Sequence, residues 1–154
     1  MSLAVGATAP DFTLENQFGE EITLSELLTE KPVVLVFFPL AFSGICTGEL
    51  CELQENLSIF QDGSVELVGV SVDSKYALRA WAEAEGYNFS ILSDFWPHGK
   101  VASDYGVFLD EAGIATRGTV VIAQDGTVAA AFTTAPGEAR DFGAYREAVA
   151  ALGK

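Results

Sequence analysis

The stretch VVLVFFPLAFSGICTGEL, residues 33–50, decides how this chain folds. Its first part, VVLVFF, has no polar alternation, which is typical of a central strand buried on both faces. A short loop with Ser43 and Gly44 follows, and a helix is predicted over residues 45–60. Cys46 lies in the first turn of that helix, on the same apolar stripe as Leu50, Leu53, Leu57 and Phe60. The sequence therefore predicts an inward-pointing cysteine where a buried strand meets a helix.

Outside this stretch, strand and helix patterns alternate along the chain. Strands are predicted at residues 11–14, 21–24, 65–72, 89–92, 119–123 and 127–132, and helices at residues 25–28, 74–85 and 142–152. The first two strands form an N-terminal β-hairpin, and the last two form another around the turn Gln124, Asp125 and Gly126. We therefore expect a single domain over residues 1–154 with an α/β, thioredoxin-like fold, in which helices flank a central mixed sheet.

The composition excludes several classes of function. A net charge of −14 repels phosphate backbones and anionic lipids, so neither nucleic acid nor a membrane is expected as a partner. The longest apolar run, residues 33–42, is far shorter than the ~20 residues that span a bilayer. The N-terminus lacks the basic start and apolar segment of a secretory leader, so we expect a cytoplasmic protein. A hydrophobic content of 49% with eleven Phe predicts a homodimer whose interface covers part of the apolar excess.

Cys46 is the residue whose position most clearly indicates a reactive side chain. Backbone N–H groups and the positive end of the helix dipole stabilise a thiolate at a helix start, and the thiolate is the reactive form. Ser43 can donate a hydrogen bond to the sulfur or to a substrate oxygen, and Pro39 can fix the loop and shield the sulfur from water. Arg117 begins the strand RGTVVIA, which is predicted to run beside VVLVFF and would bring a cation. From these residues alone, an inert buried thiol and a solvated arginine remain alternatives.

Metal and hydrolase sites find little support in the sequence. A structural zinc site needs four ligands, and the soft ligands of this chain are Cys46, Cys51 and the lone His98. A Cys/His hydrolase would use the same histidine, but no oxyanion motif accompanies it. We therefore expect no metal and no other cofactor.

Several motifs, in order along nearly the whole chain, resemble one family. They are APDFTL at residues 9–14, PLAFSGIC at 39–46, SDFWPHG at 93–99, YGVF at 105–108 and RGTVVI at 117–122. PLAFSGIC fits the pattern of Pro, three residues, Thr or Ser, two residues and Cys that marks the peroxiredoxins. Together with SDFWPHG it is most similar to the AhpE type, which is close to the bacterioferritin comigratory or PrxQ group. The resemblance implies a thiol-dependent peroxidase that reduces hydrogen peroxide, organic hydroperoxides or peroxynitrite.

The resemblance also implies a role for each matching residue. Cys46 would be the peroxidatic nucleophile that becomes a sulfenic acid. Pro39 would screen the site, Ser43 would hydrogen-bond the peroxide, and Arg117 would orient it and stabilise the leaving oxygen. Glu49 would help to hold Arg117. In addition, Phe42 and Trp96 are expected to line the substrate pocket, and a place in the apolar core is the alternative for both.

The two groups that this chain resembles differ in whether they carry a second reactive cysteine, which concerns Cys51. The AhpE type is described with one catalytic cysteine, whereas PrxQ members often carry a resolving cysteine five residues after the first, the spacing of Cys46 and Cys51. Five residues along an ideal helix separate the Cα atoms by about 8–9 Å, which is more than a disulfide spans. A bond would require the helix start to unwind, and no fastening of that start is evident in the sequence, where Gly48 weakens the helix. An inert Cys51 is the alternative.

The expected partners are a peroxide substrate and a thiol reductant. The resemblance suggests thioredoxin, or a mycothiol and mycoredoxin system, as that reductant. An alternative function is a thiol-based peroxide sensor or holdase, which would form the same sulfenic acid without efficient turnover.

Overall fold

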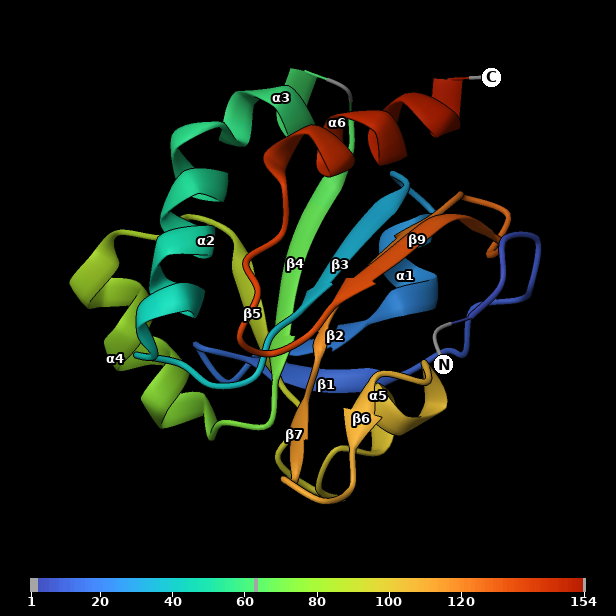
Figure 1. Cartoon of the computed structure of the whole chain (residues 1–154). Coiled ribbons are helices and arrows are strands. Elements are labelled where there is room, and N and C mark those ends of the chain that lie inside the picture. The colour runs from blue at the N-terminus through green and yellow to red at the C-terminus, as the bar shows by residue number, and fades with distance from the viewer. Residues whose placement is uncertain (1–2, 63, 154) are drawn as a thin grey trace.

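A seven-stranded mixed sheet forms the centre of the computed structural model, which describes residues 3–62 and 64–153 (Figure 1). The strands lie in the order β2-β1-β5-β4-β3-β8-β9. Strands β3, β4 and β5 are parallel, and the remaining neighbours pair in antiparallel fashion. The strands are β1 Thr13–Asn16, β2 Glu21–Thr23, β3 Val33–Phe37, β4 Glu66–Ser71, β5 Ser90–Ser93, β8 Arg117–Ile122 and β9 Val128–Thr134. The predicted mixed sheet with a hairpin at each end is confirmed.

Strand β3 lies in the middle of the sheet because all of its residues are apolar, and all are buried. Val33, Leu35 and Phe37 point into the core on one face, while Val34 and Val36 point into the core on the other. Strand β3 pairs in parallel with β4 and antiparallel with β8, with Val36 opposite Thr119. This register brings the start of β8 beside the end of β3, as the sequence predicts.

Helices cover both faces of the sheet (Figure 1). They are α1 Leu24–Leu28, α2 Gly44–Glu55, α3 Leu57–Asp62, α4 Lys75–Glu85, α5 Lys100–Asp104 and α6 Phe142–Ala150, with a final 3₁₀ turn at Ala151–Gly153. Side chains of α2, α3, α4 and α6 form one core, and those of α1 and α5 contribute to the other. Cys46 belongs to the first of these cores.

The helix predicted over residues 45–60 is wrong in one respect, because it is two helices. Helix α2 ends at Glu55 and α3 begins at Leu57. Between them Asn56 leaves the helical conformation, with φ −110° and ψ 21°. Its side-chain Nδ2 donates a hydrogen bond to the carbonyl of Glu52 at 2.9 Å. Asparagine favours such local bonds over the helical ladder. The apolar stripe nevertheless continues across the break, since Phe60 is buried in the same core as Cys46.

Short elements between residues 100 and 115 were not predicted from the sequence. They are helix α5 and the two-stranded pair β6 Phe108–Leu109 and β7 Ile114–Ala115. Elements of this length are too short to show a hydrophobic period. Within the described ranges, none of the helices has both the length and the apolar character needed to cross a bilayer.

Candidate active site

Cys46 is fully buried in the first turn of α2, at the carboxyl end of the central strand. Ser43 is the N-cap residue of the helix, and its carbonyl accepts the backbone N–H of Thr47 at 2.9 Å. The sulfur therefore lies where unpaired backbone N–H groups and the helix dipole favour negative charge. Because β3 is held between two neighbours, the chain direction into α2, and with it the position of the sulfur, is fixed.

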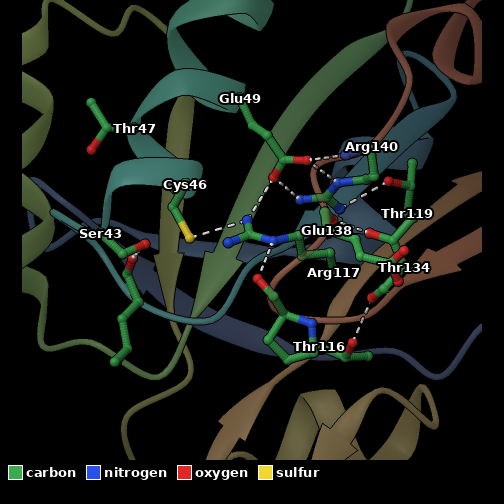
Figure 2. A network of polar contacts seen from close by, with 12 residues as sticks. Ser43, Cys46, Thr47, Glu49, Thr116, Arg117, Thr119, Thr134, Glu138 and Arg140 are labelled. Carbon is green, nitrogen blue, oxygen red and sulfur yellow. Dashed lines mark hydrogen bonds and ion pairs between the residues drawn. The ribbon is translucent and has the colours of Figure 1, made fainter.

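Arg117 reaches the sulfur from the start of β8 (Figure 2). Its Nη1 donates to Sγ of Cys46 at 3.2 Å and to Oε1 of Glu49 at 2.7 Å. Its Nε donates to the carbonyl of Pro136 at 2.9 Å. The guanidinium is only 2% exposed, so these contacts act with little screening by water. The structure thus brings together Cys46, Glu49 and Arg117, three residues that sequence analysis assigned to one site.

Arg140 is a member of this site that sequence analysis missed. It precedes α6, and its backbone N–H, Nε and Nη2 all donate to the carboxylate of Glu49, at 2.6, 3.2 and 3.0 Å (Figure 2). Its Nη1 donates to the carbonyl of Gly118 and to Oγ1 of Thr119, both at 3.0 Å. No motif marks Arg140, and the only signal in the sequence was the scarcity of cations in a chain with eight Lys and Arg residues.

Glu49 is ionised despite its burial. Burial opposes the charged form, but the hydrogen bonds and charge of Arg140, with the charge of Arg117, outweigh it and lower the pKa of Glu49 below its ordinary value. The three side chains together carry a net positive charge, and Nη1 of Arg117 directs it at Cys46. A thiolate or an anionic oxygen formed there would be stabilised by this charge.

Ser43 and Pro39 lie in the loop that joins β3 to α2. Pro39 is buried, directly beyond the end of the strand. The hydroxyl of Ser43 donates to the carbonyl of Leu40 at 3.1 Å and does not pair with the sulfur in this structure. A serine hydroxyl can rotate to another acceptor, so it can still serve a ligand beside Cys46.

The two aromatic residues expected at the substrate pocket lie in different places. Phe42 is in the same loop as Ser43, exposed, with its ring centroid 6.2 Å from that of Trp81. Trp96 is 79% exposed and lines a separate hollow with residues that include Thr13, Lys75 and Phe95. The structure therefore keeps Phe42 near the start of α2 but does not bring Trp96 to the group formed by Cys46, Glu49 and Arg117.

Cys51 is a half-buried free thiol on α2. Its Sγ donates to Oε1 of Glu85 at 3.4 Å and lies 3.6 Å from the hydroxyl of Tyr87. Burial raises the pKa of Cys51, and Glu85 adds to this effect, although the hydrogen bond with Tyr87 works against it. The raised pKa disfavours the thiolate of Cys51, which is the reactive form of a cysteine.

Two hydrogen bonds hold the start of α2 in place, contrary to the expectation from the sequence. Oγ1 of Thr47 accepts the indole N–H of Trp81 at 3.2 Å, and the carbonyl of Thr47 accepts the hydroxyl of Tyr87, also at 3.2 Å. Both donors come from or directly follow α4, far from Thr47 in the chain. Unwinding the turn that carries Cys46 would break both hydrogen bonds.

His98 takes no part in this group. Its Nε2 lies 2.7 Å from the carbonyl oxygen of Gly113, and its ring packs edge-on against Phe108. Among the residues that the structure describes, no cluster of His, Cys, Asp and Glu could hold a metal ion. The arrangement at Cys46 is that of a cationic group beside a single thiol, which suits nucleophilic attack by sulfur.

Comparison with known proteins agrees with this chemistry. Residues 5–131 match the AhpC/TSA family. The chain belongs to this family of peroxiredoxins. Alkyl hydroperoxide reductase E of Mycobacterium tuberculosis is 47% identical over 150 residues, which cover 97% of this chain and 98% of that protein. The predicted peroxiredoxin resemblance of the AhpE type is thus confirmed.

Solved peroxiredoxin structures share the fold. Peroxidoxin BcpB from Mycobacterium tuberculosis has a TM-score of 0.85 at 30% identity, covering 97% of this chain and 96% of that one. The reduced 2-Cys peroxiredoxin of Plasmodium vivax has a TM-score of 0.87 at 30% identity, covering 98% of this chain and 82% of that one. This peroxiredoxin is accordingly a thiol-dependent peroxidase, an oxidoreductase that uses a peroxide substrate and a thiol reductant.

The buried carboxylate of Glu49 makes the stability of this peroxiredoxin depend on pH. Folding lowers the pKa of Glu49. The ionised carboxylate therefore contributes to the free energy of unfolding at pH values above its ordinary pKa of 4.5, and this contribution is lost as the pH falls through the lowered pKa. At neutral pH, Glu49→Gln should lose about 3–5 kcal/mol of unfolding free energy, since two buried cations lose their counter-charge. Urea unfolding at neutral pH and at several values below 4.5 measures the difference between the two proteins.

The difference in unfolding free energy between wild type and Glu49→Gln should become smaller as the pH falls below 4.5. Glu83→Gln is the matched control, because Glu83 pairs with Arg79 on the surface of α4 and should change stability by less than about 1 kcal/mol at any pH. A deficit of Glu49→Gln that stayed constant throughout the acid range would contradict the lowered pKa of Glu49.

Proposed function

We propose that Cys46 is the nucleophile of the peroxidase. The observation that carries this proposal is the contact of 3.2 Å between its Sγ and Nη1 of Arg117 at the buried start of α2. In the proposed reaction the thiolate gives an electron pair to the nearer peroxide oxygen, and the O–O bond breaks. That oxygen stays on sulfur as a sulfenic acid. The other leaves with the bonding electron pair and is protonated to water or an alcohol, so that sulfur is oxidised and the peroxide is reduced.

In the same proposal Arg117 orients the peroxide and stabilises the charge on the leaving oxygen. Its Nη1 and Nε are engaged by Cys46, Glu49 and Pro136. Its Nη2 has no acceptor within the part of the chain that the structure describes, so this N–H group is available to a peroxide oxygen. Glu49 supports the role by fixing the plane of the guanidinium, and Arg140 supports it by fixing Glu49.

The loop before α2 completes the proposed site. The Ser43 hydroxyl would turn from the carbonyl of Leu40 to the bound peroxide, and Pro39 would keep bulk water from the sulfur. Phe42, on the exposed side of this loop, would line the entrance for the substrate.

Loss of the sulfur is the direct test of this proposal. Cys46→Ser should abolish peroxide consumption, whereas Cys51→Ser should keep the first oxidation step, because that cysteine is not paired with Arg117. Both variants are tested by stopped-flow measurement of peroxide consumption and by the mass of the intact protein after one equivalent of peroxide. Peroxide consumption by Cys46→Ser at a rate close to wild type would overturn the assignment of the nucleophile.

The two buried arginines should differ in their effect on rate. Arg117→Ala removes a preorganised donor at the reacting atoms and should slow sulfur oxidation by about 100- to 1,000-fold, equivalent to roughly 3–4 kcal/mol. Arg140→Ala should mainly lower stability, because Arg140 contacts Glu49 and not the sulfur. Arg79→Ala, which removes a surface charge from α4, is the control for net charge. A folded Arg117→Ala protein with a rate within a few-fold of wild type would count against the role of Arg117.

We further propose that Cys51 resolves the sulfenic acid of Cys46. Cys51 gives up its proton, its sulfur forms the disulfide with Cys46, and the sulfenic oxygen leaves as water. The step needs the first turn of α2 to unwind, because about 8–9 Å separates the two Cα positions in an intact helix. It also needs the hydrogen bonds of Tyr87 to Thr47 and Cys51 to break.

Wild-type protein treated with one equivalent of peroxide should therefore lose the mass of two hydrogens. Tyr87→Phe should form the disulfide faster, because it removes the hydroxyl that fastens Thr47, and Cys51→Ser should accumulate sulfenic and then sulfinic acid. Alkylation followed by mass spectrometry distinguishes these products. A wild-type protein that stops at the sulfenic acid, with Cys51 still alkylatable, would mean that an external thiol such as thioredoxin or mycothiol with mycoredoxin resolves it.

We also propose that the protein forms a homodimer through its exposed apolar side chains. Leu40, Phe42 and Ile45 are exposed around the start of α2, and Tyr76, Phe95 and Trp96 line one hollow. A second copy that covered Leu40, Ile45 and the side chains of this hollow would remove apolar surface from water. It would also give Trp96 a role in assembly in place of the expected one in the pocket.

Light scattering measures this association. We expect the mass of a dimer at near-millimolar concentration, and Trp96→Ser should shift the equilibrium toward the monomer, whereas a matched change at an exposed residue elsewhere, Phe18→Ser, should not. A monomer mass at micromolar and near-millimolar concentration, in reduced and oxidised samples alike, would refute the homodimer.

A further inference from the structure

Asp73 occupies the edge of the sheet where the carboxyl ends of β3, β4 and β5 meet. Its Oδ2 accepts the hydroxyl of Ser71, the last residue of β4, at 2.6 Å. Its backbone carbonyl accepts the hydroxyl of Ser93, the last residue of β5, at 2.6 Å. Asp73 is thereby fixed to two strands of the sheet, to β4 through its carboxylate and to β5 through its backbone carbonyl.

The same oxygen of Asp73 also holds the loop that follows β3. It accepts the backbone N–H of Ala41 at 2.8 Å, across 32 residues of sequence. Ala41 lies between Pro39 and Ser43, the two loop residues of the proposed site. Asp73 therefore ties this loop to the rigid sheet through a single carboxylate.

The conformation of the loop is one that needs such support. Phe42 has a φ of +68°, in the left-handed region that is unfavourable for a residue with a bulky side chain. Such a backbone persists only where its surroundings impose it. Here the support comes from the bond of Asp73 to Ala41, the bond of Ser43 to Leu40, and the packing of Phe42 on Trp81.

We propose that Asp73 is a positioning residue of the peroxidase, which holds the loop of Pro39 and Ser43 in place beside Cys46. The proposal rests on the proposed role of Cys46 as nucleophile. Asp73 acts through the backbone of Ala41, and its effect is on geometry. A displacement of reacting groups by about 1 Å can slow a reaction by about 100-fold. Peroxide cleavage needs oriented donors around the O–O bond, whereas alkylation of the thiol by iodoacetamide does not.

The test compares two aspartates whose carboxylates accept the same kinds of hydrogen bond. Asp11 also accepts one backbone N–H and one serine hydroxyl, both from Ser25 and both at 2.9 Å, beside α1 on the other face of the sheet. Asp73→Ala should slow oxidation of Cys46 by peroxide by about 10- to 100-fold, while alkylation by iodoacetamide stays within about threefold of wild type or becomes faster. Asp11→Ala should change neither rate, although each variant loses one hydrogen bond to a backbone N–H and one to a serine hydroxyl.

A conservative variant separates positioning from charge. In Asp73→Asn the side-chain oxygen can still accept from Ala41 and Ser71, so oxidation of Cys46 should return to within about threefold of wild type. Equal oxidation rates in Asp73→Ala and Asp11→Ala would overturn the proposal. So would an equal loss of the oxidation and alkylation rates in Asp73→Ala, because that result indicates a general disturbance of the thiol.

Two further measurements keep the outcome decisive. Hydrogen exchange on the wild-type protein should show a protected amide at Ala41, and exchange at the rate of an unstructured amide would overturn the proposal even if Asp73→Ala failed to fold. Cys46→Ser is measured alongside. Persistent peroxidase activity in Cys46→Ser would refute the proposed nucleophile, whereas its loss together with an unaffected Asp73→Ala would refute only the positioning role.

Discussion

Two arginines share one buried carboxylate, and the surroundings of Cys46 depend on that arrangement. Glu49 from α2 meets Arg117 from β8 and Arg140 from the segment before α6. Charges buried in this way are stable only when each has its partners, so loss of one partner leaves an unpaired charge in the interior. Three separate parts of the chain are therefore held together at one point. The surplus positive charge of the group faces the sulfur of Cys46.

The sheet explains why this polar group can exist in an apolar protein. Strand β3 fills both cores with alternate side chains, and its end marks the boundary between packed interior and reactive loop. Strands β4 and β5, which run parallel to β3, end at the same edge, where Ser71 and Ser93 anchor Asp73. The apolar sheet thus provides a rigid frame, and polar groups from β8, α2 and the connecting segments gather at one of its edges.

The first turn of α2 faces two opposing demands. The proposed attack on a peroxide needs Cys46 to be held against Arg117, and the hydrogen bonds of Trp81 and Tyr87 to Thr47 hold this turn in place. A disulfide with Cys51 would require the same turn to open. If Cys51 resolves the sulfenic acid as proposed, the hydrogen bonds at Thr47 oppose that step, because they hold the turn closed.

The sequence by itself determined the features that local pattern encodes. The unbroken apolar run identified β3, the helical stripe placed Cys46 inward, and the resemblance to the peroxiredoxins indicated Glu49 and Arg117. It could not reveal the break at Asn56, because the apolar stripe continues across it. Only the tertiary structure decided the role of Arg140, which meets Glu49 across 91 residues, and the fastening of Thr47. Such contacts are set by how distant segments pack, and neither periodicity nor motif records them.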